Sequence, residues 1–199
     1  MLRMTVMVPS VVAVSSSSDY TFSKPNLPSI DLVAGFGVVG DVHSGPLIRH
    51  RYLVDQDPTQ PNLRQVLLIQ QELLESLAEG GHEVGAGQLG DNITTRGLDL
   101  HALPTGTRLR LGNSALVELT GLRQPCPQVD DFQDGLTTVL RHQDAEGNSV
   151  HAAGVMGIVL DGGTVKPGDR IELDTPPEPH QPLVYIPDSH KPTRPPGVP

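Results

Sequence analysis

The sequence predicts a mainly β domain with a few helices, arranged as a small barrel or a strongly bent sheet, followed by a proline-rich C-terminal tail. Glycine and proline, with 21 and 19 of the 199 residues, make up about a fifth of the chain, which indicates many turns and few long helices. The core must be aliphatic, because the chain has no Trp and only 3 Tyr and 3 Phe. Short β-branched or alternating segments along the chain complete this pattern.

Strands are expected where β-branched residues cluster or where apolar and polar residues alternate. The clearest helix is expected over residues 70–79, where leucines fall at helical spacing and Gly80-Gly81 ends the pattern. The preceding residues 64–69 fit either the start of this helix or a strand that leads into it, because periodicity alone does not separate the two. A short helix is expected over residues 136–141. The expected strands cover residues 6–14, 30–39, 108–111, 115–120, 154–160 and 170–173.

The composition changes after Asp174, since nine of the 19 prolines lie between Pro176 and Pro199. Proline cannot donate to a sheet ladder or continue a helix, so we expect residues 175–199 to form an extended and poorly ordered tail. Residues 1–174 are then expected to form one domain, which is long enough to bury a core of its own.

Charge and cysteine content exclude several classes of function. The net charge of −9 repels phosphate backbones, so we expect no nucleic-acid partner, although a local basic pocket for one small anion is compatible with it. A single cysteine cannot form an internal disulfide or a multi-cysteine metal site. Pro9 and the polar residues 15–19 interrupt the apolar N-terminal segment before a signal peptide or a membrane span could form. We therefore expect a cytoplasmic protein without a membrane partner.

Residues 35–40 match the G-x-G-x-x-G fingerprint of dinucleotide sites, but their context does not. The fingerprint requires a helix that opens at the glycines, and Gly45-Pro46 would break such a helix within two turns. A glycine-rich bend between strands explains most of the pattern. The segment nevertheless presents an acid, Asp41, and an imidazole, His43, on a loop beside the flexible backbone of Gly40.

Cys126 lies between Pro125 and Pro127 and is the strongest candidate for a reactive group. A lone cysteine is often a buried and inert small hydrophobe. Here the two prolines hold the backbone extended, and such a segment projects its side chain more often than it packs in a regular element. Arg123, three residues earlier, favours the thiolate, which is the form that attacks or binds metal, whereas the acids at positions 130 and 131 oppose it.

Two polar residues on turns have more than one interpretation. His43 is the best candidate ligand or acid–base group among the 8 histidines, because no His-Glu-x-x-His motif occurs and the others fit surface or hydrogen-bonded core positions. Asn92, in Gly90-Asp-Asn-Ile-Thr94, fits a turn residue but could equally offer its amide to a heterocyclic ligand. A serine hydrolase is disfavoured because the chain has no Gly-x-Ser-x-Gly elbow.

Several segments follow one another in a recognisable order: residues 37–45, 64–69 with Glu72, 87–99, 103–106, 109–112, 119–123, 125–126, 153–156 and 162–169. Any one of them is a weak signal. In their order and spacing they resemble the MOSC domain, named for the C-terminal domain of molybdenum cofactor sulfurase, over residues 9–174. The resemblance implies a β-barrel-like domain with a few helices and a cleft that carries the family's cysteine, which Cys126 matches.

The resemblance also implies a cofactor and a set of residues around it. The family is thought to bind the molybdenum cofactor, a molybdenum–pterin, or to carry sulfur to metal–sulfur centres. Cys126 would then ligate molybdenum or hold sulfane sulfur, and Asp41, His43, Asn92 and Arg123 match polar positions around the cleft.

The cofactor's phosphate would need hydrogen-bond donors. Arg123, Arg96 and the backbone amides of glycine loops such as the one at Gly40 are the candidates. The chain departs from many relatives at Pro127 and Gln128, where small or basic residues are usual, so contacts with a substrate are not implied by the resemblance.

Three functions fit these observations. The first is a molybdenum-cofactor-dependent oxidoreductase that acts on small N-hydroxylated or N-oxygenated compounds, as the stand-alone bacterial members suggest, with a redox partner protein. The second is a sulfur carrier or sulfurtransferase with a persulfide on Cys126. The third is a non-catalytic cofactor-binding module in which Cys126 is merely packed. The pyridoxal-phosphate domain of the larger sulfurases is not expected, because the chain is too short to contain one.

Overall fold

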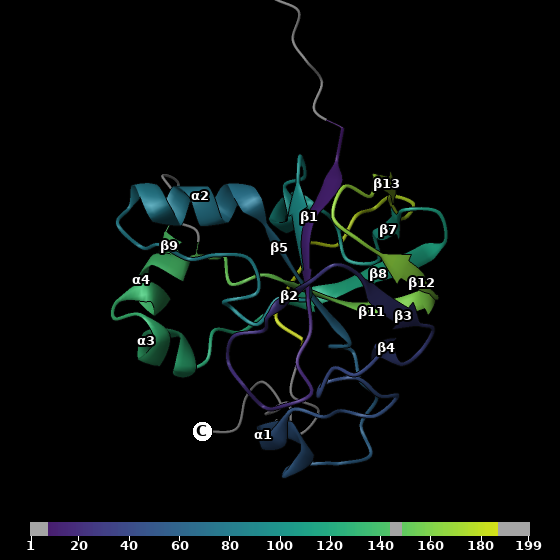
Figure 1. Ribbon diagram of the computed structural model, residues 1–199, viewed down its shortest axis with the longest axis horizontal. Coiled ribbons are helices and arrows are strands. Elements are labelled where there is room, and N and C mark those ends of the chain that lie inside the picture. Colours follow the sequence, from purple (N-terminus) through teal and green to yellow (C-terminus); the bar gives the residue numbers. More distant parts are fainter. Residues whose placement is uncertain (1–7, 144–148, 187–199) are drawn as a thin grey trace, which may run out of the picture.

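The largest element of the computed structural model is an eight-stranded sheet (Figure 1). The structure describes residues 8–143 and 149–186. Neighbouring strands are antiparallel except β5 and β6, which are parallel. The prediction of a mainly β fold with a few helices is confirmed. In spatial order the strands are β13 (Ile171–Asp174), β7 (Arg108–Leu111), β8 (Ala115–Leu122), β11 (Val155–Asp161), β5 (Val66–Gln70), β6 (Ile93–Arg96), β1 (Ser10–Ser15) and β2 (Asn26–Leu27).

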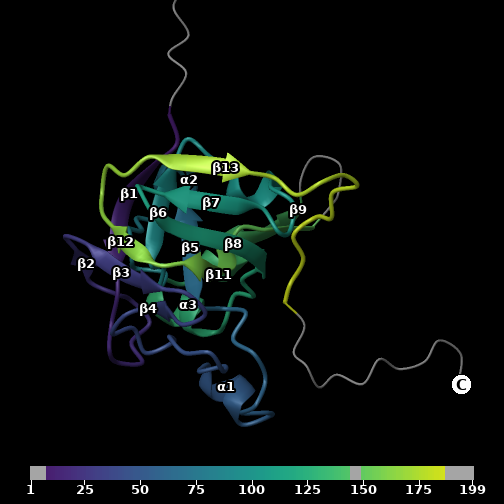
Figure 2. The same ribbon diagram turned by 90° about the vertical axis from the view of Figure 1, so that its right-hand side faces the viewer.

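The sheet bends until its two sides approach each other, which gives it a barrel-like form. Ser10 of β1 forms an isolated bridge with Arg170, just before β13, and the Val11 amide donates to the Asp169 carbonyl at 2.8 Å. Among the described residues no continuous ladder closes the barrel. A smaller sheet lies against β8 and β11 (Figure 2). It consists of β12 (Gly163–Val165), β3 (Ile30–Val33) and β4 (Gly37–Val38).

Alternation along β8 separates the inside of the bent sheet from its outside. Ala115, Val117 and Leu119 are buried, whereas the residues between them are only partly buried, as expected for a strand with one face on the core. These residues belong to the first core cluster, which is aliphatic as the composition predicts. Its strand members also include Val11, Val14, Val66, Leu68, Ile93, Leu109, Leu111, Val155, Val159 and Ile171.

The structure decides between the two interpretations of residues 64–69. They form strand β5, and α2 (Gln71–Glu79) begins directly after it. Strand β5 is apolar on both faces because Val66 and Leu68 face the first core cluster, while Ile69 faces a second one on the helix side. A strand covered on both faces loses its alternation, which is why its pattern resembles that of a helix.

The helices α2, α3 (Gln128–Phe132) and α4 (Leu136–Leu140) lie together on one side of the sheet (Figure 1). Helix α4 confirms the expected helix near residue 136. The remaining elements are α1 (Arg51–Val54), the 3-10 turn Leu100–Ala102 and the hairpin of β9 (Arg141–Gln143) with β10 (Ser149–His151). The second core cluster consists of Ile69, Leu74, Leu77, Val84, Leu89, Val129, Leu136, Leu140, Ala152 and Ala153.

Part of the proline-rich tail packs on the domain. The amides of Thr105 and Leu122 donate to the carbonyls of Gln181 and Val184, each at 2.8 Å, and Leu183 is buried. Residues 181–186 are therefore connected to the domain, because a proline-rich segment still accepts hydrogen bonds through its carbonyls. Residues 187–199 lie outside the described residues, and the domain limits at 174 stay a prediction. No described helix is long and apolar enough to cross a membrane.

Leu119 and Leu116 lie on opposite faces of β8, so the same substitution at each position tests which face of the sheet covers the core. Leu119→Ala should lower the free energy of unfolding by about 3 kcal/mol, because it leaves a cavity in the first core cluster. Leu116→Ala removes the same atoms from the partly buried face and should cost about 1 kcal/mol or less. Urea unfolding of both variants measures the difference, and equal losses would contradict this assignment of the two faces.

Candidate functional site

A buried ion pair joins two loops that lie far apart in the sequence. The Lys24 ammonium lies 2.7 Å from Oδ2 of Asp41, and the two side chains are only 4% and 1% exposed. Asp41 follows β4 in a turn that begins at Gly40, whose φ of +78° is a left-handed conformation that suits glycine. Sequence reasoning missed Lys24, because a lysine in a loop next to a proline carries no periodic or motif signal.

Asn92 completes this pair from a third loop. Its Nδ2 donates to Oδ2 of Asp41 at 2.9 Å and to the Ser15 carbonyl at 3.1 Å, while its Oδ1 accepts from the Leu67 amide at 3.2 Å. The side chain is buried, and every polar atom in it has a protein partner. Of the two interpretations of Asn92, these contacts fit the structural one, a buried link between β1, β5 and the Asp41 turn.

His43 lies at the outer side of the same carboxylate. Its Nδ1 is 3.5 Å from Oδ1 of Asp41, and its backbone amide donates to that oxygen at 3.0 Å. The ring stacks on His50 with centroids 4.4 Å apart and meets the edge of Tyr20 at 5.6 Å. The imidazole is 23% exposed, so a buried acid orients a ring that reaches the surface, which is the arrangement of a general acid or base.

The charges of this cluster shift one another's protonation. Burial alone would raise the pKa of Asp41, but hydrogen bonds from His43 and the Lys24 ammonium lower it well below its usual value. Burial lowers the pKa of Lys24, against the attraction of Asp41. Burial also lowers the pKa of His50 to about 3, and the positive charges of His43 and Arg64 act in the same direction. Asp41 is therefore ionised and His50 neutral at pH 7.

Cys126 lies on the turn between β8 and α3, where it is partly exposed. Pro127 occupies the position before the first residue of α3, where a missing amide hydrogen costs nothing. The thiol donates to Oε1 of Gln128 at 3.7 Å, and the side chain packs against the second core cluster together with Phe22 and Phe132. The thiol is thus held at the boundary between the core and solvent.

Arg123 lies beside this thiol. Its guanidinium donates to the Leu89 carbonyl at 2.7 Å and lies 5.7 Å from the centre of the Phe22 ring. Burial lowers the pKa of Arg123, while Cys126 and the buried carboxylate of Asp91 oppose that shift. The predicted proximity of Arg123 and Cys126 is therefore present in the structure.

Asp91 is a second buried acid that sequence reasoning did not select, although it directly precedes Asn92. Its carboxylate accepts from the Gly87 amide at 2.9 and 3.0 Å and from the Thr94 hydroxyl at 2.7 Å. Burial raises the pKa of Asp91, and these hydrogen bonds offset only part of that rise. Asp91 fixes the loop over residues 87–92, which contacts both Lys24 and Arg123.

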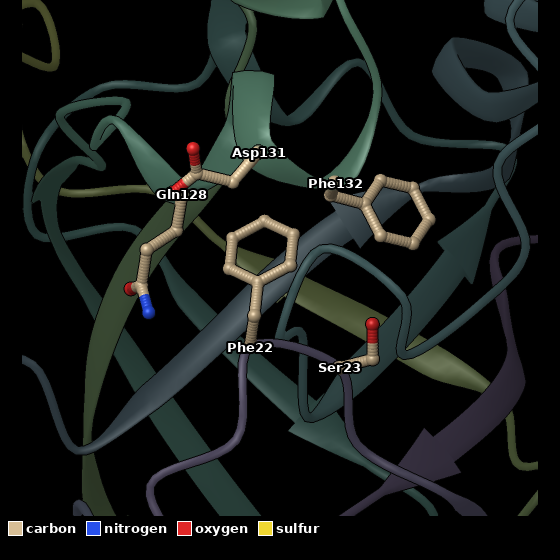
Figure 3. Close-up of a pocket in the computed structure, with 5 residues that line it drawn as sticks. All are labelled: Phe22, Ser23, Gln128, Asp131 and Phe132. Carbon is tan, nitrogen blue, oxygen red and sulfur yellow. The ribbon is translucent and has the colours of Figure 1, made fainter.

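A shallow pocket of about 220 Å³ lies between the loop after β1 and helix α3 (Figure 3). Phe22 and Ser23 come from the loop after β1, and Gln128, Asp131 and Phe132 come from α3. The two phenylalanine rings lie 5.6 Å apart. Gln128 connects the pocket to Cys126, because its side chain lines the pocket and accepts the thiol hydrogen bond.

The structure therefore arranges the predicted site residues in two groups and leaves one outside. Asp41, His43 and Asn92 form the first group, while Arg123 and Cys126 form the second, and the 87–92 loop connects them. Arg96 lies elsewhere, because its guanidinium forms an exposed ion pair with Glu75 of α2. Within the part of the chain that the structure describes, no group of three or more His, Cys, Asp or Glu side chains could hold a metal ion.

A comparison with known protein families identifies the family of this chain. The model of the MOSC domain matches residues 40–172, about two thirds of the chain. The chain belongs to the MOSC domain family. The match contains both groups of site residues, whereas Lys24, the ion-pair partner of Asp41, precedes it. No curated protein matches the sequence.

Solved structures agree with this MOSC fold. The YuaD protein from Bacillus subtilis superposes with a TM-score of 0.69 at 21% identity, over 86% of this chain and 98% of that one. YiiM from Geobacillus stearothermophilus gives 0.60 at 17% identity, over 89% and 80% of the two chains. YiiM from Escherichia coli gives 0.55 at 17% identity, over 86% and 72%. At these identities the likeness shows the fold alone.

Removing Lys24 should test the buried ion pair. Lys24→Met should lower the free energy of unfolding by about 3 kcal/mol or more, because it leaves the Asp41 carboxylate buried without its cation. Lys166→Met, at an exposed position, is the matched control and should change it by less than about 0.5 kcal/mol. Similar values for the two variants in urea unfolding would show that the pair contributes little.

His50 should make the protein less stable as the pH falls below neutral. Its folded-state pKa of about 3 lies below the ordinary 6.5, so the unfolded chain binds the extra proton between these values. From pH 7 to pH 5 this should remove about 2 kcal/mol of stability, whereas Asp41 contributes to the pH dependence only near and below its ordinary pKa of 3.8.

The fall in the free energy of unfolding from pH 7 to pH 5 should be smaller in His50→Gln by the contribution of His50. It should be unchanged in His180→Gln, which alters an exposed histidine. Urea unfolding at pH 7 and pH 5 measures it. A His50→Gln variant with the full wild-type loss would contradict the assignment.

Proposed function

We propose that this MOSC protein binds the molybdenum cofactor with Cys126 as a thiolate ligand and reduces small N-hydroxylated or N-oxygenated compounds. The observation that supports this most is the setting of Cys126. Its partly exposed thiol lies on a turn fixed by two prolines, beside the guanidinium of Arg123 and at the edge of a pocket. A thiolate is a soft ligand that suits molybdenum, and a neighbouring cation favours the thiolate.

The residues around Cys126 fit such a cofactor in chemical type. The sulfur suits the metal, and the rings of Phe22 and Phe132 offer an apolar wall to a flat heterocycle. Arg123 supplies positive charge close to the turn. The pocket of about 220 Å³ is smaller than the ~300–1,000 Å³ of most ligand pockets, so it would hold only part of such a ligand.

The proposed reaction needs electrons and protons from defined sources. Reduction of an N-hydroxylamine to an amine consumes two electrons and two protons and releases water. The cofactor, when bound, supplies the redox chemistry, and a redox partner protein supplies the electrons. We assign one proton transfer to His43, because Asp41 orients its partly exposed ring. Arg123 places a positive charge beside Cys126.

Two other functions retain support from particular observations. A partly exposed thiol next to a guanidinium is also the setting of a nucleophilic cysteine, which favours a sulfur carrier with a persulfide on Cys126. The packing of Cys126 on the second core cluster favours a binding module without catalysis.

Metal and pterin analysis of the wild-type protein and of Cys126→Ser tests the proposal. After expression in a host that makes the cofactor, the wild-type protein should contain molybdenum and pterin in similar amounts, and Cys126→Ser should lose most of the molybdenum. Gln128→Ala is the matched control, since it removes the partner of the thiol but keeps the sulfur. The wild-type protein, with a reductase partner, should also reduce an N-hydroxylated base.

Other results would favour the other functions. A wild-type protein without molybdenum that carries one additional sulfur atom by mass, lost in Cys126→Ser, would replace the proposal with the sulfur carrier. A folded protein without either modification, whose thiol reacts slowly with a thiol reagent, would favour the binding module.

A further inference from the structure

The tail segment of residues 181–186, here named the C-terminal strap, is fixed along the end of β8. The Leu122 amide donates to the Val184 carbonyl at 2.8 Å, and Leu122 forms a parallel bridge with Tyr185. The Arg64 guanidinium donates to the Ile186 carbonyl at 3.0 Å. Figure 2 shows the yellow segment after β13 turning back past this end of the sheet. The strap therefore has a defined position next to the turn that carries Cys126.

A close approach at Gly121 makes this position specific. A side-chain carbon at Gly121 would lie 2.6 Å from the Val184 carbonyl oxygen and 2.7 Å from a side-chain carbon of Ile186. Only a residue without a side chain lets the strap pack so closely on β8. Ile186 itself is buried against Leu67 and Met156. The strap is thus packed on the sheet from both its backbone and its side chains.

The strap brings Tyr185 to Arg141, the first residue of β9. Burial raises the pKa of the Tyr185 hydroxyl and the neighbouring Arg141 guanidinium lowers it. The Nη2 of Arg141 donates to the Pro125 carbonyl at 2.8 Å. Pro125 is the residue directly before Cys126. Three segments that are distant in sequence therefore meet at the carbonyl that precedes the thiol.

Backbone carbonyls take part in the described hydrogen bonds of this turn. The prolines on either side of Cys126 have no amide hydrogen to donate, so the turn is held chiefly through its carbonyls. The Cys126 carbonyl accepts from the Val129 amide at 3.0 Å within the start of α3, and the Pro125 carbonyl accepts from Arg141. A guanidinium with a phenol beside it, donating to that carbonyl, holds the carbonyl in one direction, which is a means of preorganising a reactive side chain.

We propose that Tyr185 and Arg141 are positioning residues for Cys126, so that the C-terminal strap sets the orientation of the thiol. The proposal deepens the proposed function and rests on it only in taking Cys126 as the reacting group. Neither residue is assigned a contact with substrate or cofactor. They hold the Pro125 carbonyl in place, and this carbonyl in turn fixes the direction in which the Cys126 sulfur faces the pocket.

Thiol labelling of the purified chain without cofactor tests the proposal, because Cys126 is the only cysteine. Tyr185→Phe removes one hydroxyl and should raise the labelling rate of the folded protein by about threefold to tenfold, the equivalent of one lost hydrogen bond. Arg141→Ala should raise it similarly, and Arg141→Lys, which can still donate to the Pro125 carbonyl, should restore a rate close to that of the wild-type protein. Tyr52→Phe, at an exposed tyrosine on α1, is the matched control and should have no effect.

The double variant separates positioning from general destabilisation. If the two residues act through one contact, Tyr185→Phe with Arg141→Ala should label no faster than Arg141→Ala alone. Multiplied effects, or wild-type rates in both single variants, would overturn the proposal. If Arg141→Ala does not fold, Tyr185→Phe against Arg141→Lys gives the same decision. Molybdenum content of the wild-type protein is measured separately, so normal cofactor binding with unchanged labelling would reject the positioning role and leave the proposed function intact.

Discussion

The ion pair between Lys24 and Asp41 is the interaction on which the arrangement of the site loops depends. Two charges that are almost completely buried are tolerated only when they are paired and hydrogen-bonded. Asn92 and the backbone amide of His43 supply the remaining hydrogen bonds to the same carboxylate. Because the three loops have little regular structure, this shared carboxylate makes the position of each one depend on the other two.

The cations near the site differ in whether a carboxylate already pairs with them. Lys24 is committed to Asp41, and Arg96 is committed to Glu75 on the outside of the sheet. Arg123 is the cation that lies directly at the thiol, with the Leu89 carbonyl and the Phe22 ring fixing its guanidinium. Although the chain is strongly acidic, the Arg123 guanidinium therefore places a positive charge where it would attract a thiolate or an anionic cofactor group.

Cys126 depends on a different kind of support. Two prolines restrict its backbone, the second core cluster packs against one side of it, and the pocket between Phe22 and α3 opens beside it. A reactive group held in this way loses little conformational entropy on binding a ligand, which is the general advantage of a preorganised site. The family match establishes a MOSC domain, and the setting of the thiol supports the functional proposal made for it.

The sequence by itself determined the mainly β class, the aliphatic core and the helix after residue 70, and it singled out the Asp41 loop, the Asn92 turn and Cys126 as candidates for a site. Each of these follows from local chemistry: turn residues, alternation, or an unusual run such as Pro-Cys-Pro. Only the tertiary structure decided that residues 66–70 are a strand, because burial on both faces removes the alternation that marks one. It alone paired Lys24 with Asp41, took Arg96 away from the site and brought Tyr185 to Arg141. These contacts join residues from 17 to 44 positions apart, and no local pattern encodes which distant partner a charged side chain will find.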